Sequence, residues 1–139
     1  MQIAEDGCLC GAIRYSLSGE PSYSVICHCA SCRRASGAPS VAWLTFGREQ
    51  VEIVSGDPQS YRSSLGVIRR FCGTCGSAVS YETAATPSTI DLTTASLDDP
   101  TAFPPTREVW VEEKLWWEAV NHVLDHYPRD IGGGPYAGD

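Results

Sequence analysis

Seven cysteines in three tight clusters constrain this chain more than any other feature of its sequence. The clusters are Cys8 and Cys10; Cys27, Cys29 and Cys32; and Cys72 and Cys75. The first residues form no basic and apolar leader, and no stretch approaches the ~18 apolar residues that a membrane span needs. We therefore expect a cytoplasmic protein with no membrane partner. Its thiols are then expected to be metal ligands or reactive groups rather than disulfides.

The third cluster has the Cys-x-x-Cys-Gly form of a zinc knuckle. A glycine after the second cysteine, here Gly76, supplies positive φ and frees backbone N–H groups to bond sulfur. Gly11 repeats this arrangement after the first cluster. Two distant pairs commonly supply the four ligands of a structural zinc. The matching glycines therefore predict one closed site that joins the first strand to a later hairpin, with the ligands Cys8, Cys10, Cys72 and Cys75.

The middle cluster would then form a second site of its own. Cys27, Cys29 and Cys32 offer three ligands and leave one position open, which is the ligand count of a catalytic zinc. Spacing alone leaves two alternatives open. Cys8 and Cys10 could instead group with Cys27 and Cys29, or a single structural zinc could stand beside three idle thiols. The preferred assignment gives two zinc ions per chain.

Short apolar runs separated by 13 glycines and 9 prolines favour a mainly β protein of antiparallel strands. One exception is the segment 115–127, whose apolar residues recur at helical spacing before Pro128 and predict a short C-terminal helix. The glycine-rich residues 128–139 are predicted to be a flexible tail, which leaves 1–127 as one domain. Strands are predicted at 12–17, 22–27, 40–46, 51–54, 59–62, 67–71, 78–81, 89–92 and 107–112.

The charge of the chain argues against a nucleic-acid partner. Its formal net charge is −7, whereas a nucleic-acid binder needs a basic face to displace counterions from phosphates. Only two arginine pairs occur, Arg33 with Arg34 and Arg69 with Arg70. Either pair could hold a small anion, but neither makes a basic stripe.

Three ordered motifs resemble a known family. They are Gly-Cys-Leu-Cys-Gly at 7–11, Cys-His-Cys-Ala-Ser-Cys at 27–32 and Phe-Cys-Gly-Thr-Cys-Gly at 71–76. In this order they resemble the glutathione-dependent formaldehyde-activating enzyme (GFA, or centromere-protein-V) family, from about residue 7 to about residue 117. Many members carry a histidine on a late strand, where this chain has Arg107 and Glu108.

The resemblance implies a β-tent fold built around a structural zinc. It also implies the division into a closed four-cysteine site and a catalytic site at Cys27, Cys29 and Cys32. Family members are described as carbon–sulfur lyases, and the founding member joins formaldehyde to glutathione. The implied partner is accordingly a small thiol or thiol adduct, such as glutathione or S-hydroxymethylglutathione.

The donor set of the open site points to sulfur chemistry independently of the family. Three thiolates make zinc a poor Lewis acid, less suited to producing hydroxide and better suited to binding a soft substrate thiolate. Arg33 and Arg34 directly follow the last ligand and could clamp a substrate carboxylate, while Ser36 and Gly37 would shape the same pocket. Trp43, Tyr61 and Trp110 are candidates for its walls.

Two non-enzymatic functions compete with this prediction. The aromatic residues Trp116 and Trp117 of the expected helix would suit a zinc module that binds a partner protein. Three clustered thiols could also serve as a redox sensor that releases zinc on oxidation.

Overall fold

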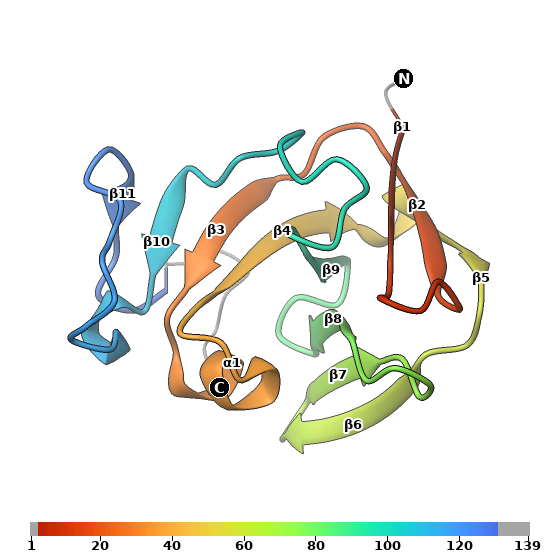
Figure 1. Cartoon of the computed structure of the whole chain (residues 1–139), viewed down its shortest axis with the longest axis horizontal. Coiled ribbons are helices and arrows are strands. Elements are labelled where there is room, and N and C mark those ends of the chain that lie inside the picture. The colour runs from red at the N-terminus through yellow and green to blue at the C-terminus, as the bar shows by residue number, and fades with distance from the viewer. Residues whose placement is uncertain (1–2, 131–139) are drawn as a thin grey trace.

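The computed structural model describes residues 3–130 and is built almost entirely of short strands (Figure 1). Within this range, one α-helix and two 3₁₀ turns interrupt the strands. In chain order the elements are β1 (Ile3–Gly7), β2 (Arg14–Ser18), β3 (Tyr23–Cys27), α1 (Ala30–Ser36), β4 (Val41–Gly47), η1 (Arg48–Gln50), β5 (Val51–Ser55), β6 (Gln59–Ser64), β7 (Val67–Phe71), β8 (Ala78–Thr83), β9 (Thr89–Thr93), β10 (Arg107–Val109), η2 (Val111–Glu113) and β11 (Asp125–His126). The mainly β class that the sequence predicts is confirmed.

The strands form a small sheet and a large one. The small sheet has the order β1-β2-β5, and the large one has the order β11-β10-β3-β4-β9-β8-β7-β6. Most neighbours are antiparallel, as expected from their short connections, but β10 pairs in parallel with both β3 and β11. Figure 1 shows the large sheet curving from β10 at one side to β6 and β7 at the other, with the small sheet beside it. Among the described residues, no helix is long and apolar enough to cross a membrane.

The central strand β4 is buried on both faces, and this creates two apolar clusters. Leu44 and Phe46 pack with Leu92 in the cluster that adjoins the small sheet. Trp43 belongs instead to the cluster that contains Val25 and the middle cysteines. Because successive side chains of a strand point to opposite faces, one strand supplies both clusters.

The sequence did not predict α1. Its N-cap is Cys29, whose sulfur accepts a hydrogen bond from the backbone N–H of Cys32 at 3.3 Å. Its C-cap is Gly37, which has the left-handed φ of 70° that glycine tolerates best. The helix is too short to show a periodic pattern, so its cysteine spacing was interpreted only as a ligand motif.

The predicted helix at 115–127 is wrong. This segment consists of turns followed by β11, with Trp116 and Val123 left 90% and 86% exposed. The Lys114 ammonium donates to the carbonyls of Leu115 and Glu118, and the Asn121 N–H donates to the Glu108 carboxylate. The Asn121 bond ties the segment to β10, and the Lys114 bonds occupy carbonyls that a helix would pair internally, so these contacts override the local pattern.

Glu108 holds this C-terminal segment against the large sheet. Its side chain is almost fully buried and accepts from His28 Nε2 at 2.6 Å and from the Asn121 N–H at 2.5 Å. His126 Nε2 lies 3.4 Å from the same carboxylate. The chain then continues beside β10, where the carbonyls of Pro128 and Arg129 accept from Glu112 and Trp110. The rest of the predicted tail, 131–139, lies outside the described residues.

Replacing Glu108 is expected to be costly. Glu108→Ala leaves the buried His28 without its partner and removes the acceptor of the Asn121 N–H, which should lower the free energy of unfolding by about 3 kcal/mol. Glu112→Ala is the matched control, because Glu112 is half exposed and pairs with Arg129 at 3.3 Å. Exposed pairs contribute between about 0 and 1 kcal/mol. Urea unfolding compares the two variants, and equal losses would contradict the assigned role of Glu108.

Asp91 on β9 gives the protein a pH-dependent stability. Burial raises the pKa of Asp91 from 3.8 to about 7, against a smaller lowering by the hydrogen bond from Thr45 Oγ1. The folded protein thus keeps this proton to higher pH than the unfolded chain does. Its contribution to stability is therefore present at low pH and is lost as the pH rises from about 4 to 7.

Asp91→Asn isolates this contribution. The stability difference between variant and wild type should shift in favour of the variant as pH rises from 5 to 7, by at most about 1.4 kcal/mol per pH unit. Both proteins carry the same cysteines, so any thiol titration cancels in the difference. Chemical unfolding at several pH values measures it. A difference independent of pH would show that Asp91 does not titrate in this range.

Candidate metal centres and the adjoining cavity

The four cysteines of the first and third clusters meet at one end of the molecule. One sulfur from each of Cys8, Cys10, Cys72 and Cys75 lies within 4.8 Å of all the others. The Sγ atoms of Cys8 and Cys10 are 3.6 Å apart, and those of Cys10 and Cys72 are 3.8 Å apart. Four sulfurs held tetrahedrally at about 2.3 Å from zinc would stand about 3.8 Å from one another. The cluster therefore fits a tetrahedral thiolate site.

Two glycine turns shape this cluster. Gly11 and Gly76 both have positive φ, 82° and 79°, and a side chain at either position would meet no atom within 4 Å. The backbone conformation, not lack of space, therefore selects glycine. The turns place N–H groups against sulfur, with Ile13 N 3.2 Å from Cys8 Sγ and Thr74 N 3.4 Å from Cys72 Sγ. Such donors stabilise thiolates, as the sequence pattern predicts.

The three middle cysteines form a separate and more deeply buried cluster. Cys27 ends β3, Cys29 caps α1 and Cys32 lies one turn into that helix. Their sulfurs lie within 4.8 Å of one another, and none of the three residues is more than 5% exposed. All seven cysteines are free thiols. The structure thus brings together the two sets that the preferred interpretation grouped, and not the alternative set with Cys8 beside Cys27.

Charge in the middle cluster is distributed unevenly. Hydrogen bonds from Cys27 and Cys32 lower the pKa of Cys29 to about 3, whereas the same kind of contact with Cys29 and Cys32, together with burial, raises the pKa of Cys27. One thiolate is favoured, and further ionisation is opposed by its neighbours. A divalent cation removes that opposition, because it allows coordinating thiols to ionise together. The donor set therefore suits a metal ion.

His28 is not part of this cluster. Its Nε2 is held by Glu108, and its backbone N–H donates to the Val109 carbonyl on β10. Residue 28 therefore anchors the loop between Cys27 and Cys29 to the neighbouring strand. This contact fixes the direction in which the two flanking cysteines project.

A cavity of about 550 Å³ adjoins the middle cluster through Cys32. Trp43 and Tyr61 form part of its wall, as the sequence suggested, whereas Trp110 is buried elsewhere in the same apolar cluster. Three arginines also line it, Arg34 from α1 and Arg69 and Arg70 from β7. Arg69 additionally stacks on the Tyr81 ring at 4.9 Å. The cavity thus combines an apolar wall with concentrated positive charge.

The four predicted substrate contacts divide into two groups. Arg34 and Ser36 line the cavity. Arg33 points away from it and donates to the carbonyls of His28 and Glu113 at 3.4 and 3.5 Å. Gly37 does not line the cavity and acts as the C-cap of α1.

Arg69 and Arg70 were not assigned to this site from the sequence. In the sequence they stand out only as a second arginine pair that could hold a small anion. This pair is distant from the middle cysteines along the chain. The curl of the large sheet brings β7 opposite α1 (Figure 1). That proximity depends on strand order, which the sequence pattern does not specify.

These features define a small β protein with one closed and one open cysteine cluster beside an arginine-lined cavity. The family model described as glutathione-dependent formaldehyde-activating enzyme matches residues 3–113, and the chain belongs to this GFA family. A solved structure of a protein from Rhodobacter sphaeroides is 23% identical and has a TM-score of 0.58, covering 73% of this chain and 99% of its own. That likeness supports the fold alone. No curated protein matches the sequence.

The two clusters are expected to respond differently to the loss of one ligand. Cys72→Ser should yield insoluble protein, because binding at structural zinc sites is worth about 10–16 kcal/mol, as much as a domain's entire net stability. Cys29→Ser should fold and bind one metal ion fewer per chain. Elemental analysis and solubility measure both effects. Equal solubility of the two variants would contradict the division into a structural and an open site.

Proposed function

We propose that this protein is a zinc-dependent carbon–sulfur lyase of the cytoplasm, with zinc in both cysteine clusters. Its substrate would be an anionic thiol adduct such as S-hydroxymethylglutathione. The observation that carries the proposal is the opening of the three-thiol cluster, through Cys32, into a cavity lined by three arginines. Membership of the GFA family supports the same reaction class.

Cys27, Cys29 and Cys32 would hold the catalytic zinc, whose thiolate-rich coordination would favour the substrate's sulfur as its anion. The same residues limit what the site can do. Three sulfur donors and burial at 5% exposure or less disfavour hydroxide chemistry. These properties suit a reaction in which the substrate's sulfur would leave carbon and be bound by the zinc.

Arginines of the cavity would orient the substrate through its carboxylates. A guanidinium binds a carboxylate by paired, charge-assisted hydrogen bonds. Glutathione carries two carboxylates, and the cavity is lined by Arg34 from α1 and by Arg69 and Arg70 from β7. Anchoring both ends would position the thiol between them, beside Cys32.

In the lyase direction the C–S bond of the adduct breaks with its electron pair passing to sulfur. The adduct's hydroxyl loses its proton to water, and its C–O bond becomes the carbonyl of the released aldehyde. Ser36 Oγ already donates to the Cys32 carbonyl at 2.8 Å. Its role is therefore to hold the helix turn that carries the third ligand, not to accept the proton.

Exchange between formaldehyde and glutathione tests the proposal. NMR exchange spectroscopy should show zinc-loaded protein accelerating the interconversion above its spontaneous rate, and Cys29→Ser should abolish the acceleration. Arg34→Ala should lower kcat/KM about tenfold or more, because a hydrogen bond to a charged group contributes about 1.5–3 kcal/mol. Arg62→Ala is the matched control, since Arg62 lies next to Tyr61 on β6 but does not line this cavity.

Three outcomes would count against the proposal. Full activity in Cys29→Ser would exclude catalysis by the middle cluster. Unchanged kcat/KM in Arg34→Ala would reject the carboxylate assignment. A doubly zinc-loaded protein inert toward every thiol adduct would favour an interaction module, for which the exposed side chains of Trp116 and Trp117 provide a surface.

A further inference from the structure

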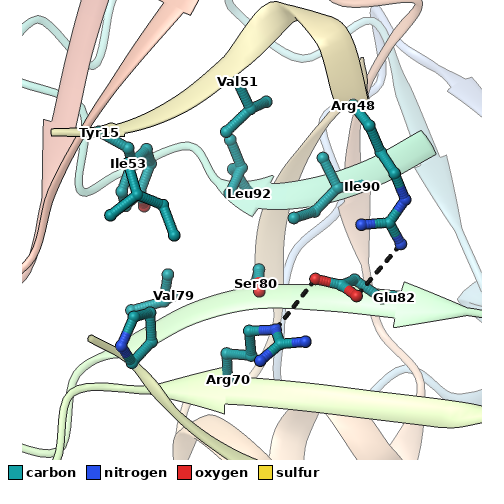
Figure 2. A pocket seen from close by; sticks show the side chains of 11 residues that line it. Tyr15, Arg48, Val51, Ile53, Arg70, Val79, Ser80, Glu82, Ile90 and Leu92 are labelled. Atoms are coloured by element: carbon teal, nitrogen blue, oxygen red, sulfur yellow. Dashed lines mark hydrogen bonds and ion pairs between the residues drawn. The ribbon is translucent and has the colours of Figure 1, made fainter. Parts of the chain in front are cut away.

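A second cavity, of about 270 Å³, lies between the small sheet and the large one (Figure 2). No cysteine lines it. Its walls are mostly apolar and come from both sheets. They include Val51 and Ile53 on β5, Val79 on β8, and Ile90 and Leu92 on β9. Such a hollow favours the apolar body of a small ligand.

One end of this cavity carries a network of three charges. The Glu82 carboxylate accepts from Arg48 Nη2 and from Arg70 Nε, each at 3.1 Å. Two guanidiniums therefore face one carboxylate, which leaves this end with a net positive charge. Figure 2 shows the network beside the aliphatic side chains of β9. The excess charge favours an anionic ligand group.

Ser80 adds an unsatisfied polar group at the same end. The residue is 3% exposed and lines the cavity, and its Oγ has no hydrogen-bond partner among the described residues. An unpaired buried hydroxyl costs about 1–3 kcal/mol, and native proteins rarely leave one without a role. The hydroxyl is therefore available to a ligand that enters the cavity.

Ser80 and Arg70 are direct neighbours across β7 and β8. Side chains of such a cross-strand pair project to the same face of the sheet. Within the described residues, Arg70 makes its ion pair through Nε, and its two terminal nitrogens have no hydrogen-bond partner. A hydroxyl and a guanidinium edge are thus available together at the end of an apolar hollow.

We propose that this cavity is a binding site for a small monocarboxylate with an aliphatic or aromatic body. Its carboxylate bonds the terminal nitrogens of Arg70 and the hydroxyl of Ser80, and its body packs against β5 and β9. The Glu82 carboxylate does not repel it, because Arg48 and Arg70 already neutralise that group. The site needs no metal and does not depend on the lyase proposal.

Titration of the full-length, zinc-loaded protein with hexanoate and hexanamide tests the assignment. The two probes share a chain and differ in charge. Backbone amide chemical shifts should show saturable hexanoate binding that perturbs β5, β8 and β9, with hexanamide at least tenfold weaker. Equal affinity for the two probes would overturn the role of Arg70, and failure of hexanoate to saturate would overturn the site.

Variants at the cavity locate the binding. Ile53→Trp should occlude the opening and weaken hexanoate at least tenfold. Val54→Trp is the matched control, because the neighbouring residue on β5 is equally exposed, 58% against 54%, but does not line the cavity. It should leave the affinity within twofold of wild type.

Removal of the unpartnered hydroxyl gives an independent readout. Ser80→Ala should weaken hexanoate by roughly 12- to 160-fold, because a hydrogen bond to a charged group contributes about 1.5–3 kcal/mol. Unchanged affinity in Ser80→Ala would remove the hydroxyl from the site. Unchanged affinity in Ile53→Trp would assign hexanoate to the larger cavity and overturn the proposal.

Discussion

The meeting of four thiols from two distant turns is the constraint on which the rest of the structure depends. The turn after β1 and the turn between β7 and β8 belong to different sheets, and the contact between Cys10 and Cys72 spans 62 residues of sequence. β8 begins directly after this cluster, so its position and that of β7 follow from it. Those two strands carry Arg69, Arg70 and Ser80. The closed cluster therefore determines where the charged walls of both cavities stand.

The open cluster is positioned differently. Strand β3, helix α1 and the C-terminal segment together hold its three cysteines in place. Cys27 comes from the end of β3, and Cys29 uses its own sulfur to cap α1. Between them, His28 reaches back to Glu108, which in turn holds the segment carrying Asn121 and His126. The Glu108 carboxylate on β10 thus holds the loop that carries Cys27 and Cys29. Burial of all three thiols then follows from the packing of Val109 and Trp43 around them.

Local sequence rules predicted the features that depend on local chemistry. Cysteine spacing and the glycines at 11 and 76 identified the turns, since positive φ is a property of a single residue. The strands were recognised from composition and alternation, with two exceptions. Acidic residues conceal β1, and β11 lies in the segment predicted to be a helix. The prediction of a helix at 115–127 was wrong because the apolar residues have helical spacing, whereas N–H groups of this segment bond Glu108 and β10. The meeting of Arg70 with Ser80 was equally out of reach, because it depends on strand register beside a bulge.

Arg70 links the two cavities physically. Its side chain and that of Ser80 line both the arginine-rich cavity beside Cys32 and the apolar hollow between the sheets. One guanidinium has a fixed number of donors, and Glu82 already occupies one of them. The carboxylates proposed for the two cavities would therefore compete for the donors that remain. Thermodynamic linkage then requires that each ligand lower the affinity for the other by the same factor. Arg70 would thus couple the binding of a thiol adduct beside the cysteines to the binding of a carboxylate in the hollow between the sheets.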